Sequence, residues 1–237
     1  MTRQRILLTG AKGQLGWELA RTLPCLGEVV SPGKSELDFS RRDALRLAVQ
    51  DISPDLIVNA AGYTRVDDAE REPAVAHLIN AEGPQLLADE AARLGASIVH
   101  FSSGYVFSGR EGRPYTEHDA TAPINAYGRS KAAGERAVLR SGAPAYIFRL
   151  GWVFGLRGPN FLSTVRAAAA TAAELRVVED QHGTPTWVRL AATMVTLALG
   201  EVLQARRHQR TVPPTGIYHL AAPGPLQRLG DARQMGR

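Results

Sequence analysis

The feature that most constrains the fold is a glycine-rich turn between a short apolar run and a helical pattern near the N-terminus. Arg5–Thr9 is predicted to be a buried strand, and Trp17–Leu23 has the apolar spacing of a helix. Gly10 permits a tight turn, Gly13 lets the backbone approach a pyrophosphate, and Gly16 lets the helix pack closely against the strand. Free N–H groups at a helix start favour phosphate. The segment therefore predicts a dinucleotide-binding loop, with the spacing G-x-x-G-x-x-G.

Strand and helix patterns alternate along the rest of the chain. The further strands are expected at Gly27–Ser31, Leu56–Ala60, Ser97–Ser103, Ala145–Leu150, Leu175–Val178 and Gly216–Ala221. The helices are expected at Asp43–Gln50, in one or two segments of 72–94, and at Ala126–Arg140, Asn160–Thr171 and Val188–Gln204. This alternation predicts an α/β fold with a doubly wound, mostly parallel Rossmann sheet. We expect 1–153 and 187–221 to form that domain, and 154–186 with 222–237 to form a small, incomplete substrate lobe and tail.

Composition excludes several classes of protein. The one cysteine, Cys25, rules out an internal disulfide framework and fits a reducing compartment. No apolar run reaches the roughly 18 residues that a membrane span needs, and the N-terminus does not resemble a secretory signal. The net charge of +5 comes without the basic stripe or aromatic motif of a nucleic-acid-binding protein. We expect a soluble, cytoplasmic protein with no nucleic-acid or membrane partner.

The candidate catalytic residues are Tyr127, Lys131 and Ser103. A tyrosine and a lysine four residues apart on a helix share one face. An ammonium group beside a phenol stabilises the phenolate, so the phenol releases its proton more easily. Ser103 ends a predicted strand, where its hydroxyl can hold a carbonyl oxygen. Together they are suited to protonating a carbonyl while hydride arrives from a cofactor. A pair of exposed residues on an ordinary helix is the alternative.

The remaining signals concern the ligand site. Ligands of doubly wound sheets bind at the carboxyl ends of the strands, and Gly13, Ala61, Ser103 and Trp152 each follow such an end. A NAD-preferring site usually has an acid after its second strand, whereas this chain has Lys34. Lys34 favours NADPH because it can pair with a 2′-phosphate, although a solvated loop lysine is the alternative.

These residues resemble the extended short-chain dehydrogenase/reductases and, within them, the dTDP-4-dehydrorhamnose reductase family. The matching segments are Thr9–Gly16, Glu36–Phe39, Asn59–Asp67, Ser102–Phe107, Pro114–Glu117, Tyr127–Glu135, Arg149–Gly155 and Asp180–Thr186. The resemblance implies an oxidoreductase that uses NADPH, or alternatively NADH, to reduce the 4-keto group of dTDP-4-dehydro-L-rhamnose. The product, dTDP-L-rhamnose, would serve polysaccharide biosynthesis.

The resemblance also implies roles for individual residues. Tyr127 would donate the proton, Lys131 would lower the pKa of the phenol and hold the nicotinamide ribose, and Ser103 would bind the carbonyl. The expected cofactor site comprises Gly10, Gly13, Gln14, Leu15, Gly16, Lys34, Asp38, Phe39, Ala61, Gly62, Tyr63, Ser102, Tyr127 and Lys131. The expected substrate site comprises Ser103, Gly104, Tyr105, Tyr127 and Trp152. Packing inside the lobe is the alternative role of Trp152.

Some positions depart from the family pattern. Gly104 stands where the family usually has Asp, and Gly151 where it often has Ser. The segment 223–237 lacks apolar periodicity, so we expect a C-terminal truncation or a shifted reading frame that leaves the substrate lobe incomplete and the activity impaired. Two alternatives therefore stay open: a non-catalytic NADP-binding subunit resembling the regulatory subunit of methionine adenosyltransferase, and a related nucleotide-sugar epimerase. Some related reductases use Mg²⁺, but no ligand cluster in the sequence supports a metal site. A homodimer is a further option.

Overall fold

The computed structural model describes residues 3–170, 181–224 and 226–227, and its centre is a parallel β-sheet. The strands of that sheet, in the order β2-β1-β3-β4-β5-β9, all run in one direction. Their bounds are Gly27–Val30, Gln4–Thr9, Leu56–Asn59, Ser97–Ser103, Ala145–Leu150 and Gly216–Leu220. The predicted doubly wound α/β fold is confirmed. The strand order reverses between β1 and β3, which is where such sheets bind ligands.

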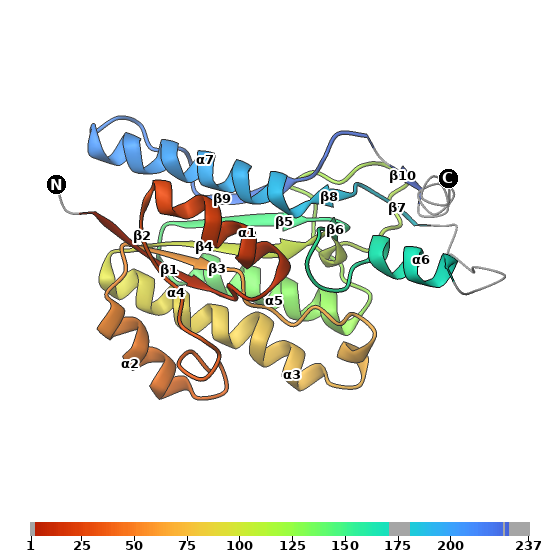
Figure 1. Ribbon diagram of the computed structural model, residues 1–237, viewed down its shortest axis with the longest axis horizontal. Helices are drawn as coiled ribbons and strands as arrows, with labels where there is room; N and C mark the ends of the chain where they lie inside the picture. The colour runs from red at the N-terminus through yellow and green to blue at the C-terminus, as the bar shows by residue number, and fades with distance from the viewer. Residues whose placement is uncertain (1–2, 171–180, 225, 228–237) are drawn as a thin grey trace.

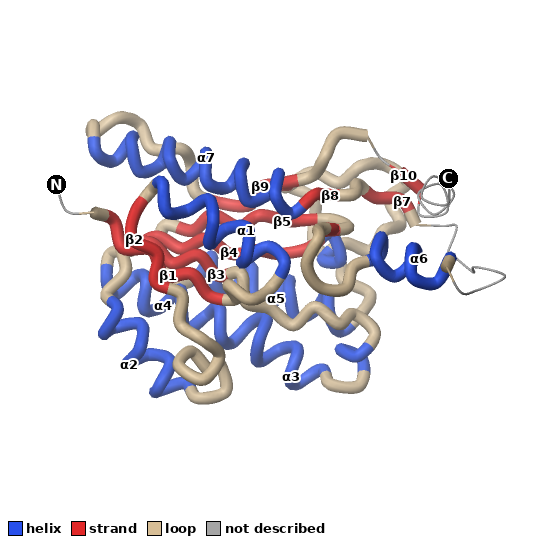
Figure 2. The backbone as a smooth tube through the Cα atoms, in the orientation of Figure 1, coloured by secondary structure: helices blue, strands red, loops and turns tan. Residues whose placement is uncertain are grey.

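Helices cover both faces of the sheet (Figure 1). One face is covered by α1 (Gln14–Thr22) and α7 (Val188–Arg207). The other is covered by α2 (Arg42–Ile52), α4 (Gly83–Leu94) and α5 (Ala126–Arg140). The strands are buried on both faces, so they read as nearly continuous apolar runs instead of alternating patterns. Figure 2 shows the same arrangement of strands between two helical layers.

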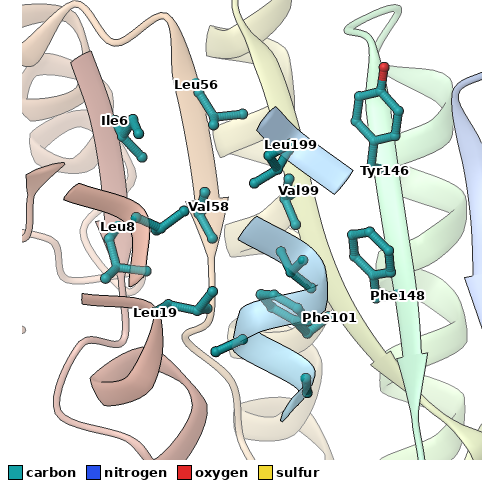
Figure 3. Packing of buried hydrophobic residues seen from close by; sticks show 14 of the residues in the cluster. Ile6, Leu8, Leu19, Leu56, Val58, Val99, Phe101, Tyr146, Phe148 and Leu199 are labelled. Carbon is teal, nitrogen blue, oxygen red and sulfur yellow. The ribbon is translucent and has the colours of Figure 1, made fainter. Parts of the chain in front are cut away.

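Side-chain alternation divides the core between the two faces. Ile6 and Leu8 point toward α1 and α7, where they join Val58, Val99 and Phe148 (Figure 3). The intervening strand residues point to the opposite face and pack against α2, α4 and α5; they are Leu7, Ile57, Ile98 and Ile147. A period of two residues produces this division.

The face toward α5 changes from apolar to polar at the carboxyl ends of the strands. On β1, β3, β4, β5 and β9, the residue two positions beyond the last apolar one on this face is polar, and β4 adds a second polar residue two positions further on. Paired across the sheet, these are Thr9, Asn59 and His100, and then Ser102, Arg149 and His219. A polar row therefore lies directly above the core at the edge where a ligand of this fold binds.

The helical region 72–94 is interrupted by a π-helical turn. It runs through α3 (Pro73–His77), the π turn η3 (Leu78–Glu82) and α4. The sequence predicted one or two helical segments here but not the change of helix type. A π turn inserts an extra residue into the helix, and such turns are frequent at functional sites.

A small cluster of elements lies beyond the carboxyl edge of the sheet, on the right of Figure 1. There β6 (Val153–Phe154) pairs with β8 (Thr186–Trp187), and β7 (His182–Gly183) pairs with β10 (Leu226–Gln227). Helix α6 (Phe161–Ala169) accompanies them. The predicted strand Leu175–Val178 lies outside the described residues. We propose that this cluster belongs to the substrate lobe, for which the sequence predicts the bounds 154–186 and 222–237.

Helix α7 has the length and composition of a membrane span, with a mean hydropathy of 1.3 over its most apolar window. The residues on its buried side, Ala191, Val195, Leu199 and Val202, pack in the core together with residues of α1. Packing on the sheet therefore explains the apolar residues on the buried side of α7, whereas Leu190, Met194 and Leu197 are exposed.

Candidate active site

The glycine loop has the backbone geometry that a close phosphate approach needs. Gly10 has φ +70°, and a Cβ added there would lie 2.5 Å from the carbonyl carbon of Ala60. A Cβ at Gly16 would lie 2.1 Å from the carbonyl oxygen of Gly10. Gly13 is the N-cap of α1, and the first turn of that helix carries no acidic side chain. The loop can therefore present its helix N-terminus to an anion.

The ends of β1, β3 and β4 are joined by buried hydrogen bonds. The Thr9 hydroxyl donates to Asn59 Oδ1 over 2.6 Å, and Asn59 Nδ2 lies 3.1 Å from His100 Nδ1. The backbone N–H of Ala61 donates to Thr9 Oγ1 at 3.3 Å. This network fixes the start of the segment 61–63, which was predicted to line the cofactor.

Asn80, on the π turn, links that segment to α5. Its Oδ1 accepts from the N–H of Tyr63 at 2.9 Å, and its Nδ2 donates to the Tyr63 carbonyl and to Ser130 Oγ, each at 3.0 Å. A Cβ at Gly62 would lie 3.7 Å from Lys131 Nζ, so this glycine faces the Lys131 ammonium. Asn80 was not among the predicted site residues, because only the folded π turn brings it here.

Helix α5 begins at the predicted residue because its N-terminus is capped twice. Asn125 Oδ1 accepts from the N–H of Gly128 at 2.7 Å, and Glu70 Oε1 accepts from the N–H of Ala126 at 2.5 Å. The caps satisfy N–H groups that a helix start otherwise leaves free. Tyr127 and Lys131 both lie on the buried side of this helix, with exposed fractions of 8% and 5%.

Tyr127 and Ser103 lie next to each other at the carboxyl edge of the sheet. The Tyr127 hydroxyl is hydrogen-bonded to the side chain of Ser103, and its ring packs edge-to-face on Tyr105 at 5.6 Å. Burial raises the pKa of Tyr127 to about 12, while the Ser103 hydrogen bond opposes that rise. At neutral pH the phenol therefore keeps its proton.

The ammonium group of Lys131 contacts the backbone of β4. Its Nζ donates to the carbonyl of Phe101 at 2.6 Å. Burial lowers the pKa of Lys131 to about 8, and the charge of Glu135 opposes that change. In this structure the net change at Tyr127 is a rise in pKa caused by burial, so the lowering of that pKa by Lys131 stays a prediction for the complex with cofactor.

Trp152 lies where the strand β5 leaves the sheet. It has φ +38°, which is unusual for a bulky side chain, and a Cβ at Gly183 would lie 2.6 Å from its ring. The N–H of Thr186 donates to the Trp152 carbonyl at 3.1 Å. The ring thus packs on the segment 181–186, as a lobe-packing residue would. Asp180 of that motif lies outside the described residues.

Comparison with known proteins identifies the family. The sequence matches the profile described as the RmlD substrate binding domain over residues 4–236. The dTDP-4-dehydrorhamnose reductase of Burkholderia thailandensis is 44% identical over 228 residues, covering 96% of this chain and 76% of that protein. The chain belongs to the dTDP-4-dehydrorhamnose reductase family. The predicted resemblance is therefore confirmed.

Two further members of the family support this conclusion. The Escherichia coli K12 enzyme is 41% identical over 223 residues, which is 92% of this chain and 73% of the relative. The crystal structure of dTDP-4-dehydrorhamnose reductase from Bacillus anthracis in complex with NADP has a TM-score of 0.88 and 33% identity. That match covers 99% of this chain and 80% of the other.

The residues predicted to contact the adenosine half of the cofactor are Lys34, Asp38 and Phe39. The carboxylate of Asp38 accepts from the backbone and hydroxyl of Ser40, which lowers its pKa, and the charges of Lys34 and Arg41 lower it further. Lys34 is exposed. Phe39 is buried, and its ring fills the space beside Gly83 at the start of α4. Arg41 was missed, because the sequence shows it as one of many arginines.

Two other predicted residues, Gln14 and Ser102, differ in their hydrogen bonding. Gln14 Nε2 donates to the carbonyl of Pro159 at 3.1 Å, so the start of α1 meets the loop before α6. Ser102 Oγ is buried without a hydrogen-bond partner among the described residues.

Within those same residues, no group of three or more His, Cys, Asp or Glu side chains is placed to hold a metal ion.

Proposed function

We propose that this chain reduces the 4-keto group of dTDP-4-dehydro-L-rhamnose to give dTDP-L-rhamnose, with hydride from NADPH. The observation that carries the proposal is the contact of Tyr127 with Ser103 at the carboxyl edge of the sheet, with Lys131 one turn along the same helix. The names of the relatives support the substrate, and the NADP complex of the Bacillus anthracis relative supports the cofactor.

The residues present fit a nicotinamide dinucleotide. The positions of Gly10 and Gly16 allow no side chain, which leaves the backbone of the loop free to approach a pyrophosphate. Gly62 leaves a space beside Lys131, where the nicotinamide ribose would lie. When bound, the cofactor supplies the hydride.

The side chains of Ser103, Tyr127 and Lys131 would then orient the carbonyl and transfer the proton. The hydroxyl of Ser103 donates to the substrate carbonyl and orients it toward Tyr127. Tyr127 gives its proton to that oxygen as the carbonyl carbon is reduced, so the ketone becomes an alcohol. The Lys131 ammonium, charged below a pH of about 8, stabilises the phenolate that remains. Trp152 and Tyr105 would border the sugar.

We further propose that NADPH is preferred to NADH. Lys34 and Arg41 both lie near enough to Asp38 to lower its pKa, so two cations flank the end of β2 where a 2′-phosphate would lie. Replacing Lys34 by Met should lower kcat/KM for NADPH about tenfold and leave that for NADH unchanged. Equal kcat/KM for both cofactors in the unaltered protein would contradict this preference.

The decisive experiment follows NADPH oxidation with dTDP-4-dehydrorhamnose. Tyr127→Phe should lower kcat by about 10³-fold without changing the affinity for NADPH. Tyr146→Phe is the matched control, because Tyr146 is also buried but its hydroxyl donates to the carbonyl of Pro213. Full activity of Tyr127→Phe would reject the assignment.

The same assay separates the alternatives. Net consumption of NADPH distinguishes reduction from epimerisation, which returns its hydride. An inactive chain that binds a methionine adenosyltransferase would point to the regulatory subunit.

We also propose a cytoplasmic homodimer. Leu190, Met194 and Leu197 are exposed on α7, and Trp187 is exposed at its N-cap; the four recur every three or four residues, which suits contact between two copies of this helix. The exposed thiol of Cys25 suits a reducing compartment. Light scattering after size-exclusion chromatography tests the dimer, and Leu197→Glu should give a monomeric mass.

A further inference from the structure

A buried ion pair that the mechanism does not use lies next to the catalytic residues on α5. Tyr127, Lys131 and Glu135 follow one another at intervals of four residues on the buried side of that helix. Glu135 is 2% exposed, and its partner Arg149 on β5 is 4% exposed. Replacing a buried pair by apolar side chains often costs no stability, so packing alone does not explain this one.

Arg149 contacts a different element on each side of its guanidinium group. Its Nε and Nη2 donate to the two carboxylate oxygens of Glu135 at 2.8 and 2.7 Å. Its Nη1 lies 3.4 Å from Nε2 of His219 on β9. The guanidinium carbon lies 4.8 Å from the centre of the Phe107 ring, in the loop after β4.

That loop also carries residues of the predicted substrate site. Phe107 follows Ser103 by one short turn and stacks on Tyr115 with ring centres 4.2 Å apart. Glu117, further along the loop, accepts from the N–H of His219 at 2.8 Å. Arg149 thus joins helix α5, the loop after Ser103 and the edge strand β9 at one point.

We propose that Glu135 and Arg149 are positioning residues for the reaction: the pair holds Tyr127 and Lys131 in place against Ser103, and the carboxylate of Glu135 keeps the Lys131 ammonium charged. The inference rests on the proposed function for its kinetic consequence. Its electrostatic part concerns this chain alone.

The groups around Lys131 support the electrostatic part. Tyr127 and Glu135 face it from α5, His100 faces it from β4, and Arg149 lies behind Glu135 on β5. Burial holds the pKa of His100 well below its ordinary value, so the imidazole is neutral. Glu135 is the group that raises the pKa of Lys131 against burial, which lowers it to about 8.

The first test titrates Lys131 directly. The chain has three lysines, Lys12, Lys34 and Lys131, so their ¹³Cε NMR signals are assigned with two Lys→Arg variants. Glu135→Gln should lower the pKa of Lys131 by roughly one unit, because the opposing charge is lost while the side-chain shape is kept. An unchanged pKa would overturn the electrostatic part. The titration needs no substrate, so a wrong substrate assignment leaves it valid.

The second readout is the pH profile of kcat. The ammonium is lost as pH rises through the pKa of Lys131, so activity should fall above a pH of about 8 in the unaltered protein. Glu135→Gln should move this alkaline limb to lower pH by the same shift that NMR measures. A limb that stays in place would contradict the proposal.

A matched control uses a second buried carboxylate. Glu90 is 1% exposed and bonds Arg46 and Arg93, each at 3.1 Å, on the same side of the sheet but away from Lys131. Glu90→Gln should lower the melting temperature without moving the alkaline limb. A shifted limb in this variant would show that the effect is a general loss of structure.

A double variant separates positioning from folding. Glu135→Leu with Arg149→Met replaces the pair by apolar side chains and should keep a cooperative melting transition. We expect kcat to fall about tenfold and the limb to stay shifted, with the affinity for NADPH nearly unchanged. Wild-type kcat and an unshifted limb in the double variant would show that the pair is structural only. If this variant does not fold, the Glu135→Gln titration still decides.

Discussion

Two regions of the molecule meet at the proposed site, and they are built differently. At the carboxyl ends of β1, β3 and β4, the buried polar side chains of Asn59, Asn80 and Lys131 are held by hydrogen bonds of 2.6 to 2.9 Å to residues distant in sequence. In the described parts of the region 152–187, the strands have two residues each, and Trp152 has an unusual backbone conformation. The contrast suggests that the core secures the proton-transfer geometry, while short segments that can change independently select the sugar.

The largest effect is expected from Gly16→Ala in the first region. Its Cβ would lie 2.1 Å from the backbone oxygen of Gly10, so α1 must shift and NADPH affinity should fall about 100-fold or more. Gly200→Ala on α7 is the matched control, since its Cβ would make an ordinary contact at 3.5 Å from Leu26. That change should stabilise the protein by up to about 1 kcal/mol. Calorimetric titration measures the affinity for NADPH, and thermal melts measure the stability. Tight NADPH binding by Gly16→Ala would contradict the assignment of this loop to the pyrophosphate.

The same substitution in the two regions should give different results. Asn80→Ala leaves the backbone groups of Tyr63 buried and without Asn80 as their partner, which should cost about 2–3 kcal/mol of unfolding free energy and also lower kcat. Asn160→Ala removes the capping box of α6 and should cost about 1 kcal/mol. Urea denaturation measures the unfolding free energy of the two variants, and steady-state kinetics measure their kcat. Equal losses of stability and of kcat in both variants would contradict the distinction between the two regions.

Trp152→Gly should affect the substrate and not the fold. Glycine tolerates the positive φ at this position, so the backbone strain is relieved as the ring is lost. We expect KM for the nucleotide sugar to rise about 10- to 100-fold with little change in the melting temperature. An unchanged KM would assign the ring to lobe packing.

The smallest effect is expected from Gly104→Asp, which restores the residue that the family usually has. A Cβ at this position would have no neighbour within 4 Å, so the fold should not change. One new hydrogen bond to the sugar should lower KM about fivefold. A higher KM, or a loss of stability, would show that position 104 does not face the sugar.

Much of the fold could be predicted because local signals agreed with tertiary packing. The strands Ser97–Ser103 and Ala145–Leu150 begin and end as predicted, since apolar runs of that length suit a sheet covered on both faces. Helix α5 also has its predicted bounds. Helix α1 begins at Gln14 and not at Trp17, because Gly13 caps it directly. The π turn around Asn80 carried no local signal.

For the proposed site, the sequence by itself determined which residues lie on one helical face and which follow a strand end, because backbone periodicity sets those relations. It therefore brought Tyr127, Lys131 and Ser103 together. Only the tertiary structure decided their ionisation and their partners. Burial raises the pKa of Tyr127 and lowers that of Lys131, and Arg149 meets Glu135 across the sheet. Desolvation and pairing depend on segments distant in sequence, which no local pattern encodes.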